Sequence, residues 1–167
     1  LLLTCLYGGN GNSRGDGQVS FEAPTKDMLF NIEHLAGWSK VGKLPAYEML
    51  DLDDVTAVLE EFGRFCVEEI APLNVPGDQI GSSFDDGQVT MPPGFSEAYG
   101  HFVEMGWQSL QHPEEFGGQG LPRSVGAAAT EILNAANMSF ALCPLLTDGA
   151  IEALLTAGCE ATKTTYL

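Results

Sequence analysis

Basic residues are scarce in this chain. Its 167 residues include 7 Lys and Arg against 23 Asp and Glu, which gives a formal net charge of −16. Nucleic-acid binding relies on clustered Lys and Arg that track phosphates, so the composition excludes a nucleic-acid partner. Carboxylates spread over solvated helix faces explain the acidic excess more simply than a dedicated interaction surface does.

Cysteines are few and widely dispersed, at Cys5, Cys66, Cys143 and Cys159. A structural zinc site needs closely spaced pairs of ligands, which this spacing does not offer. We interpret the four residues as small buried apolar side chains or free thiols, and a disulfide between two of them stays an open alternative. A helical chain of this size does not require a disulfide, which favours a reducing cytoplasm.

The amino-terminal residues contain no hydrophobic run of membrane length. Residues 1–6 are apolar but much shorter than a span, and they lack the basic residues that open a secretory signal. Residues 8–17 are rich in Gly, Asn and Ser and cannot bury enough surface to become ordered. We therefore predict a flexible leader over residues 1–20, with no membrane span.

Apolar residues make up 44% of the chain, enough for the core of one compact domain, and they recur at helical spacing. A docking helix is expected to begin at Thr25 as its N-cap and to end at Gly37. A second helix should begin at Asp51 and stop at Ala71–Pro72. Its predicted inward stripe consists of Val55, Val58, Leu59, Phe62, Cys66 and Ile70.

Residues 74–91 are rich in Gly, Pro, Asp and Ser, which predicts a long ordered loop. Three further helices are expected: one after Pro92–Pro93, one from Pro122, and one that begins at Pro144 and ends at Gly158. No alternating strand pattern is present. The predicted fold class is therefore all-α, a helical bundle.

Side chains that could carry chemistry do not form a recognisable set. Glu97 and His101 stand one helical turn apart, but a metal centre in a helix bundle needs a second such pair. We expect His101 to be solvated or hydrogen-bonded, and the lone His34 and His112 likewise. The Gly-rich segment 117–120 follows no strand and matches no nucleotide-binding loop, so its glycines are expected to allow a sharp turn. The sequence predicts no catalytic residue and no metal site.

Three separated pieces of the sequence carry a more specific signal. They are HPEEFGGQGLP at residues 112–122, APTKDMLF at residues 23–30 and GQVTMPPGF at residues 87–95. The first resembles a turn between helices in the N-terminal domain of the acyl-CoA dehydrogenase family. The other two resemble a bacterial subgroup of that family with an extra amino-terminal segment, related to methylmercaptopropionyl-CoA and long-chain acyl-CoA dehydrogenases.

The resemblance covers residues 21–167 and implies two parts. Residues 21–50 would be the N-terminal extension with its docking helix, and residues 51–167 the N-terminal helical domain. Such enzymes remove an α proton with a carboxylate while the β hydrogen leaves as hydride to FAD, giving a trans-enoyl-CoA in fatty-acid or related acyl-CoA catabolism.

The family places the carboxylate base in a C-terminal helical domain. It places the flavin contacts mainly in a β-domain, the C-terminal domain and a neighbouring subunit of a homo-oligomer. Because residues 1–167 resemble neither of those domains, FAD is not expected to bind to this chain alone. The isolated chain is therefore expected to lack turnover.

The resemblance also implies that the N-terminal helices form a wall and floor for the acyl chain of acyl-CoA. Matching the family pattern puts Leu142, Leu145, Leu146 and Gly149 beside that cavity, although a Leu-rich helix face can equally pack into a core. Two alternatives stay open. One is a non-catalytic helical partner that joins a dehydrogenase-like subunit through an exposed apolar surface, and the other is the remnant of a damaged gene.

Overall fold

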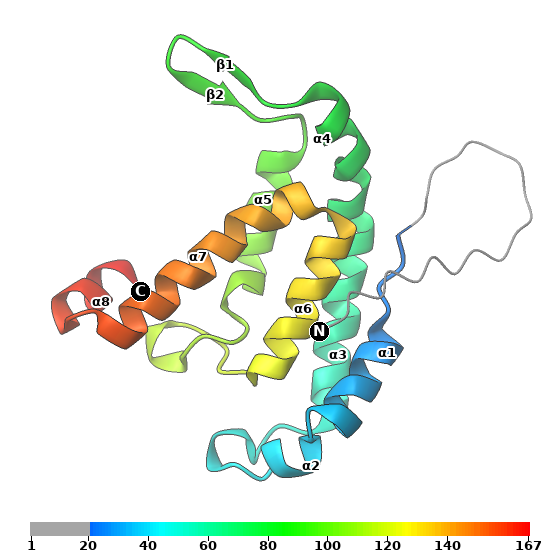
Figure 1. The fold of residues 1–167 in the computed structure, drawn as a ribbon, viewed down its shortest axis with the longest axis vertical. Coiled ribbons are helices and arrows are strands. Elements are labelled where there is room, and N and C mark those ends of the chain that lie inside the picture. The colour runs from blue at the N-terminus through cyan, green and yellow to red at the C-terminus, as the bar shows by residue number, and fades with distance from the viewer. Residues whose placement is uncertain (1–20) are drawn as a thin grey trace, which may run out of the picture.

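Helices account for nearly all of the regular structure in residues 21–167, which are the residues that the computed structural model describes (Figure 1). The all-α prediction is confirmed, and the predicted leader over residues 1–20 lies outside the described part. In chain order the elements are α1 Thr25–Phe30, η1 Asn31–Leu35, α2 Trp38–Val41, η2 Pro45–Tyr47, α3 Leu52–Phe65, η3 Cys66–Ile70, η4 Ala71–Leu73, α4 Asn74–Ile80, β1 Ser83–Asp85, β2 Gln88–Thr90, α5 Phe95–Glu104, η5 Trp107–Ser109, η6 Glu114–Phe116, α6 Arg123–Ala136, α7 Met138–Ala157 and α8 Glu160–Tyr166.

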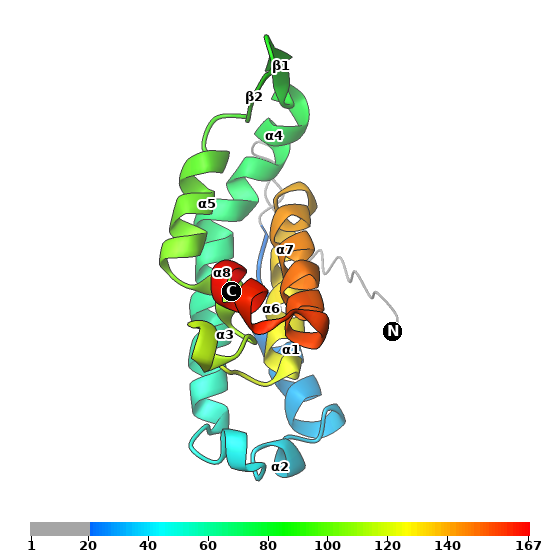
Figure 2. The same cartoon turned by 90° about the vertical axis from the view of Figure 1, so that its left-hand side faces the viewer.

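The helices are arranged around one long column. Figure 1 shows α3 and α4 as a continuous vertical column through the short turns η3 and η4, with α6 and α1 packed beside α3. Helix α7 packs on α6 and leads away from it obliquely to α8 and the C-terminus. Figure 2 shows that α7 lies on one side of the molecule, so one of its faces turns away from the other helices.

Helix α3 begins where the sequence predicts, at a capping box. The Asp51 carboxylate accepts a hydrogen bond from Asp54 N at 2.9 Å, and the Asp54 carboxylate accepts one from Asp51 N at 3.0 Å. These bonds satisfy two amides that the first turn leaves free. The predicted stripe also faces inward: all of its members are buried except the half-buried Val58.

The prediction that Ala71–Pro72 stops this helix is right for the helix itself, whose last turn η3 ends at Ile70, but wrong in expecting a loop to follow. Pro72 lies in the first turn of the 3-10 segment η4, where its missing N–H breaks no helical hydrogen bond, so the helical path continues into α4. The long loop predicted for residues 74–91 is also wrong, because that segment holds α4 and a small antiparallel hairpin. Asp86 and Gly87 both have positive φ, 44° and 79°, which suits a two-residue hairpin turn.

Two predicted helix starts need correction. Thr25 is the first residue of α1 and not its cap, since Pro24 occupies the cap position without a side-chain hydrogen bond. Pro144 lies inside α7 and does not begin it. The true cap of α7 is Asn137, whose side chain accepts a hydrogen bond from Phe140 N at 3.1 Å. Proline in a first turn also suits a helix start, which is why the sequence predicts Pro144 in place of Asn137.

Aromatic side chains form the part of the core that reaches α7. Phe62 of α3 packs against Trp107 with ring centroids 4.9 Å apart, and Phe102 of α5 meets Phe140 of α7 at 5.9 Å. Phe140 is buried and anchors the first turn of α7. Cys66 is buried in the same core, and burial raises the pKa of its thiol to about 12. The base of α7 is thus fixed by apolar packing.

Replacing Asp51 by Ala tests the capping box. We expect the free energy of unfolding to fall by about 1 kcal/mol, because the first turn of α3 loses its side-chain cap. Urea unfolding measures the change. Glu60→Ala, at an exposed site within α3, is the matched control and should change stability by less than about 0.5 kcal/mol. Equal losses in the two variants would contradict the role of the cap.

Candidate functional site

The four residues predicted to line an acyl cavity share one face of α7. Leu142, Leu145, Leu146 and Gly149 follow the i, i+3, i+4, i+7 spacing that brings side chains together on a helix. The three leucines are 51%, 45% and 73% exposed, and a Cβ added at Gly149 would meet open space. They therefore do not pack into the core of residues 21–167.

The opposite face of α7 holds the helix on the domain. Its buried residues are Phe140, Ala141 and Pro144, all in the first half of the helix. Most of the remaining side chains are also apolar, yet only 17% of the most apolar stretch is buried. A helix that is apolar on all sides is normally covered on all sides, and an exposed apolar face of this kind is typical of a surface that binds a ligand or another protein segment.

Helix α7 is also the one helix among residues 21–167 that is long and apolar enough to cross a membrane, by length and composition alone. A single helix of this kind is weak support for a membrane span, because helices packed inside proteins pass the same test. Asp148 and Glu152 lie on α7 and bond to residues outside it. These polar contacts favour a helix docked on protein.

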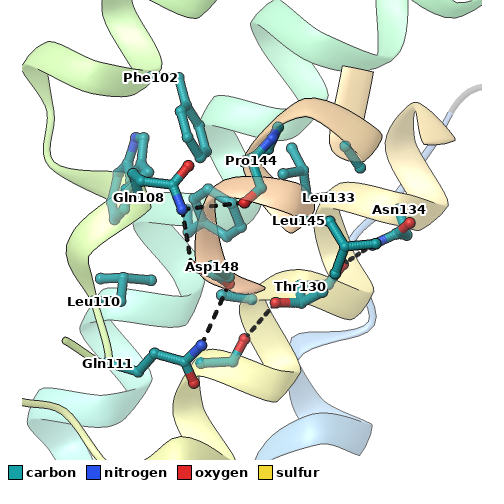
Figure 3. Close-up of a pocket in the computed structure, with 15 residues that line it drawn as sticks. Phe102, Gln108, Leu110, Gln111, Thr130, Leu133, Asn134, Pro144, Leu145 and Asp148 are labelled. Atoms are coloured by element: carbon teal, nitrogen blue, oxygen red, sulfur yellow. Dashed lines mark hydrogen bonds between the residues drawn. The ribbon is translucent and has the colours of Figure 1, made fainter. Parts of the chain in front are cut away.

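A polar cluster joins the second half of α7 to the segment after α5. The Asp148 carboxylate accepts hydrogen bonds from Gln108 Nε2 at 2.8 Å and from Gln111 Nε2 at 3.4 Å (Figure 3). His112 Nε2 lies 2.7 Å from the same carboxylate and donates a hydrogen bond to it. The His112 side chain is only 6% exposed. This cluster could not be predicted from the sequence, because 36 to 40 residues separate its two sides along the chain.

The cluster borders two small cavities. One, of about 40 Å³, lies between the α5–α6 segment, α6 and α7, and Leu145 and Asp148 contribute to its lining (Figure 3). Another, of about 130 Å³, is bordered by His112, Phe116 and Ile151. Small-molecule pockets typically measure about 300–1,000 Å³. Residues 21–167 therefore present an open apolar face and not an enclosed acyl cavity, and neither hollow fits a flavin.

Glycines shape the turn that carries His112. Gly117 and Gly120 have φ of 85° and 64°, and a Cβ at Gly118 would lie 2.1 Å from the backbone oxygen of His112. The turn is closed by hydrogen bonds from Gly118 N to Pro113 O at 3.0 Å and from Gly120 N to His112 O at 2.9 Å. The prediction that these glycines allow a sharp turn is confirmed.

His101 is hydrogen-bonded, which is one of the two states predicted for it, and its partner is a carboxylate. Its Nδ1 lies 2.6 Å from Glu69 Oε2, which ties α5 to η3. The hydrogen bond and the negative charge of Glu69 raise the pKa of His101 above 6.5, with a smaller contribution from Glu104. Within residues 21–167, no group of three His, Cys, Asp or Glu side chains could hold a metal ion.

Comparison with known proteins identifies the family. The family model described as "Acyl-CoA dehydrogenase, N-terminal domain" matches residues 53–167. The chain belongs to the acyl-CoA dehydrogenase family. The predicted resemblance is thereby confirmed, and the matched range contains nearly all of α3 and every later element through α8.

Two relatives in the acyl-CoA dehydrogenase family are similar over most of this chain. It is 56% identical over 149 residues to 3-methylmercaptopropionyl-CoA dehydrogenase of Ruegeria pomeroyi, covering 89% of this chain and 25% of that protein. It is 26% identical over 119 residues to the broad-specificity linear acyl-CoA dehydrogenase FadE5 of Mycobacterium tuberculosis, covering 70% of this chain and 20% of that protein. The matched segment thus spans a quarter or less of either relative.

Gly118→Ala tests the turn. We expect a loss of at least about 2 kcal/mol in the free energy of unfolding, because the added methyl group meets the backbone of His112, which cannot move without breaking the turn. Gly100→Ala in α5 is the control, since a Cβ there meets nothing within 4 Å. That change should raise stability by about 0.5–1 kcal/mol. A harmless Gly118→Ala would contradict the turn geometry.

Glu69→Gln tests the His101 tether through its pH dependence. Because the folded state raises the pKa of His101, the pair stabilises the fold fully below pH 6.5 and loses this effect as the pH rises through the raised value. The variant should return the pKa of His101 toward 6.5 in an NMR titration. Its stability deficit should be larger at about pH 6 than at about pH 9. Glu68→Gln is the control, and a deficit independent of pH would disprove the tether.

Proposed function

We propose that the protein is an FAD-dependent acyl-CoA dehydrogenase, to which residues 21–167 contribute one wall of the acyl pocket. The observation that carries this proposal is the outer face of α7. The positions that the family pattern assigns to the acyl side lie together there, and they are exposed while the opposite face is buried. The 56% identity to a dehydrogenase of a short thioether acyl-CoA supports the same substrate class.

The chemistry of this face suits an apolar acyl tail. Leu142, Leu145 and Leu146 present methyl groups without a hydrogen-bond donor or acceptor, so methylene and thioether groups can pack on them without loss of polar contacts. Each methylene group removed from water contributes about 0.8 kcal/mol. Gly149 has open space where a side chain would project, which leaves room for a ligand at that end of the face.

The reaction itself requires groups outside the described residues. FAD, when bound, would accept the hydride that leaves the β carbon, and a carboxylate would take the α proton. Residues 21–167 would hold the acyl chain in place and keep water away from it, which raises the rate by positioning. We therefore expect the isolated chain to show no dehydrogenation.

A second candidate function also follows from the exposed face of α7. A non-catalytic helical subunit could use the same face to bind a dehydrogenase-like partner, because exposed apolar patches commonly mark protein interfaces. The two functions differ in their spectroscopic result. Purified intact protein that shows flavin absorbance and oxidises butanoyl-CoA supports the enzyme. Protein that forms a stable complex without flavin supports the partner role.

Leu146→Gln in the intact protein tests the acyl wall. We expect the affinity for octanoyl-CoA to fall about five- to tenfold, because part of the ~1.5–3 kcal/mol available from burying a leucine is lost. The melting temperature should stay unchanged, since this side chain is 73% exposed. Leu35→Gln, at a site 76% exposed on η1, is the matched control. Equal affinity of both variants and the parent protein for octanoyl-CoA would contradict the proposed wall.

A further inference from the structure

The rotation of α7 about its own axis is not fixed by apolar burial alone. Most of its residues are apolar, and they lie on every side of the helix. Several rotations would therefore bury a similar apolar area against α6. A helix turns by about 100° per residue, and a roll of that size would replace one set of exposed side chains by another. Contacts with a fixed direction must therefore select the observed rotation.

Such contacts lie along one line of α7. Phe140, Pro144 and Asp148 are spaced four residues apart and all face the α5–α6 side. Phe140 supplies apolar packing at the start of this line. Further along, Gln108 Nε2 donates to Pro144 O at 3.3 Å as well as to Asp148 at 2.8 Å. The polar part of the line is therefore held by directional bonds.

The Asp148 cluster is more directional than a simple ion pair. Three donors reach its two carboxylate oxygens, from Gln108, Gln111 and His112. Among residues 21–167, the buried atoms Gln108 Oε1 and His112 Nδ1 have no protein hydrogen-bond partner. Buried polar clusters can specify one arrangement of packed elements even where they add little net stability.

The helical geometry connects this cluster to the proposed acyl face. Counted from Asp148 at about 100° per residue, Leu142, Leu145, Leu146 and Gly149 all fall between roughly 60° and 160° on the same side of the axis. Cys143 and Thr147 fall on the other side, at roughly 140° and 100°. Rolling α7 would exchange leucines for a thiol and a hydroxyl on the acyl side.

We propose that Asp148, held by Gln108, Gln111 and His112, is a positioning residue that fixes the rotation of α7 and so aims its leucines at the acyl chain. The acyl part of this proposal rests on the proposed function. The rotation is a property of the described helices and can be tested without substrate. Asp148 itself need not contact the acyl chain.

Thiol labelling of Cys143 tests the rotation. Cys143 is exposed on α7, whereas Cys66 is fully buried. Replacing Cys5 and Cys159 by Ser in the intact protein therefore leaves Cys143 as the one readily labelled thiol among the four cysteines of residues 1–167. We expect Asp148→Leu to change the rate of Cys143 reaction with a thiol reagent at least about threefold. Asp148→Asn keeps an acceptor oxygen for Gln108 and His112 and should restore most of the parent rate.

Two controls separate rotation from unfolding. Glu131→Leu removes an exposed carboxylate on α6 and should leave the Cys143 rate unchanged. Slow labelling of Cys66 shows that the core stays closed.

If Asp148→Leu does not fold, Gln108→Met removes the donor shared by Pro144 and Asp148 at similar side-chain size. It should change the labelling rate of Cys143 in the same direction. An unchanged Cys143 rate in a folded Asp148→Leu or Gln108→Met variant overturns the proposal.

Affinity for octanoyl-CoA tests whether Asp148 affects binding of the acyl chain. It also separates the positioning role of Asp148 from the proposed acyl wall. A weakening of at least about fivefold in Asp148→Leu, restored by Asp148→Asn, supports the positioning role. Weakening by Leu146→Gln without any effect of Asp148→Leu overturns that role and leaves the acyl wall standing. If neither variant changes the affinity, the proposed function of this face fails and the acyl role of Asp148 fails with it.

Discussion

The hydrogen bonds that Asp148 accepts from the segment between α5 and α6 are the constraint on which the outer half of the domain depends. Packing of Phe140 against Phe102 secures only the beginning of α7. Beyond Pro144 the inner side of the helix has no further fully buried residue. Packing on α6 sets the direction of α7, and the side on which its apolar face lies follows from polar contacts at 2.7–3.4 Å.

Those contacts require an accurately placed partner loop. His112 opens a turn in which Gly118 passes so close to the backbone of His112 that no side chain fits. Gln108 and Gln111 lie just before the turn, and α6 follows it. The glycine segment, which carries part of the family resemblance, is thus linked to α7 by geometry, because it follows directly after the donors that meet Asp148. A motif without catalytic groups can therefore still affect a binding surface.

Local signals in the sequence predicted most of the helices but not their tertiary contacts. The capping box at Asp51 and the apolar stripe of α3 are written in consecutive turns, so a single sequence reveals them. The helix start predicted at Pro144 is wrong because the buried packing of this proline inside α7 outweighs the loss of one helical hydrogen bond. The Asp148 cluster could not be predicted, because its members are adjacent only after α5, α6 and α7 have packed together.

The hairpin that extends beyond α4 exposes an apolar cross-strand pair, Phe84 opposite Val89 (Figure 1). Exposed strands can recruit strands from other molecules and so begin aggregation. Each strand here has only three residues, and Asp85 and Asp86 place negative charge at the tip of an already acidic chain. Short length and electrostatic repulsion therefore protect neighbouring copies from edge-to-edge association while leaving the aromatic ring accessible.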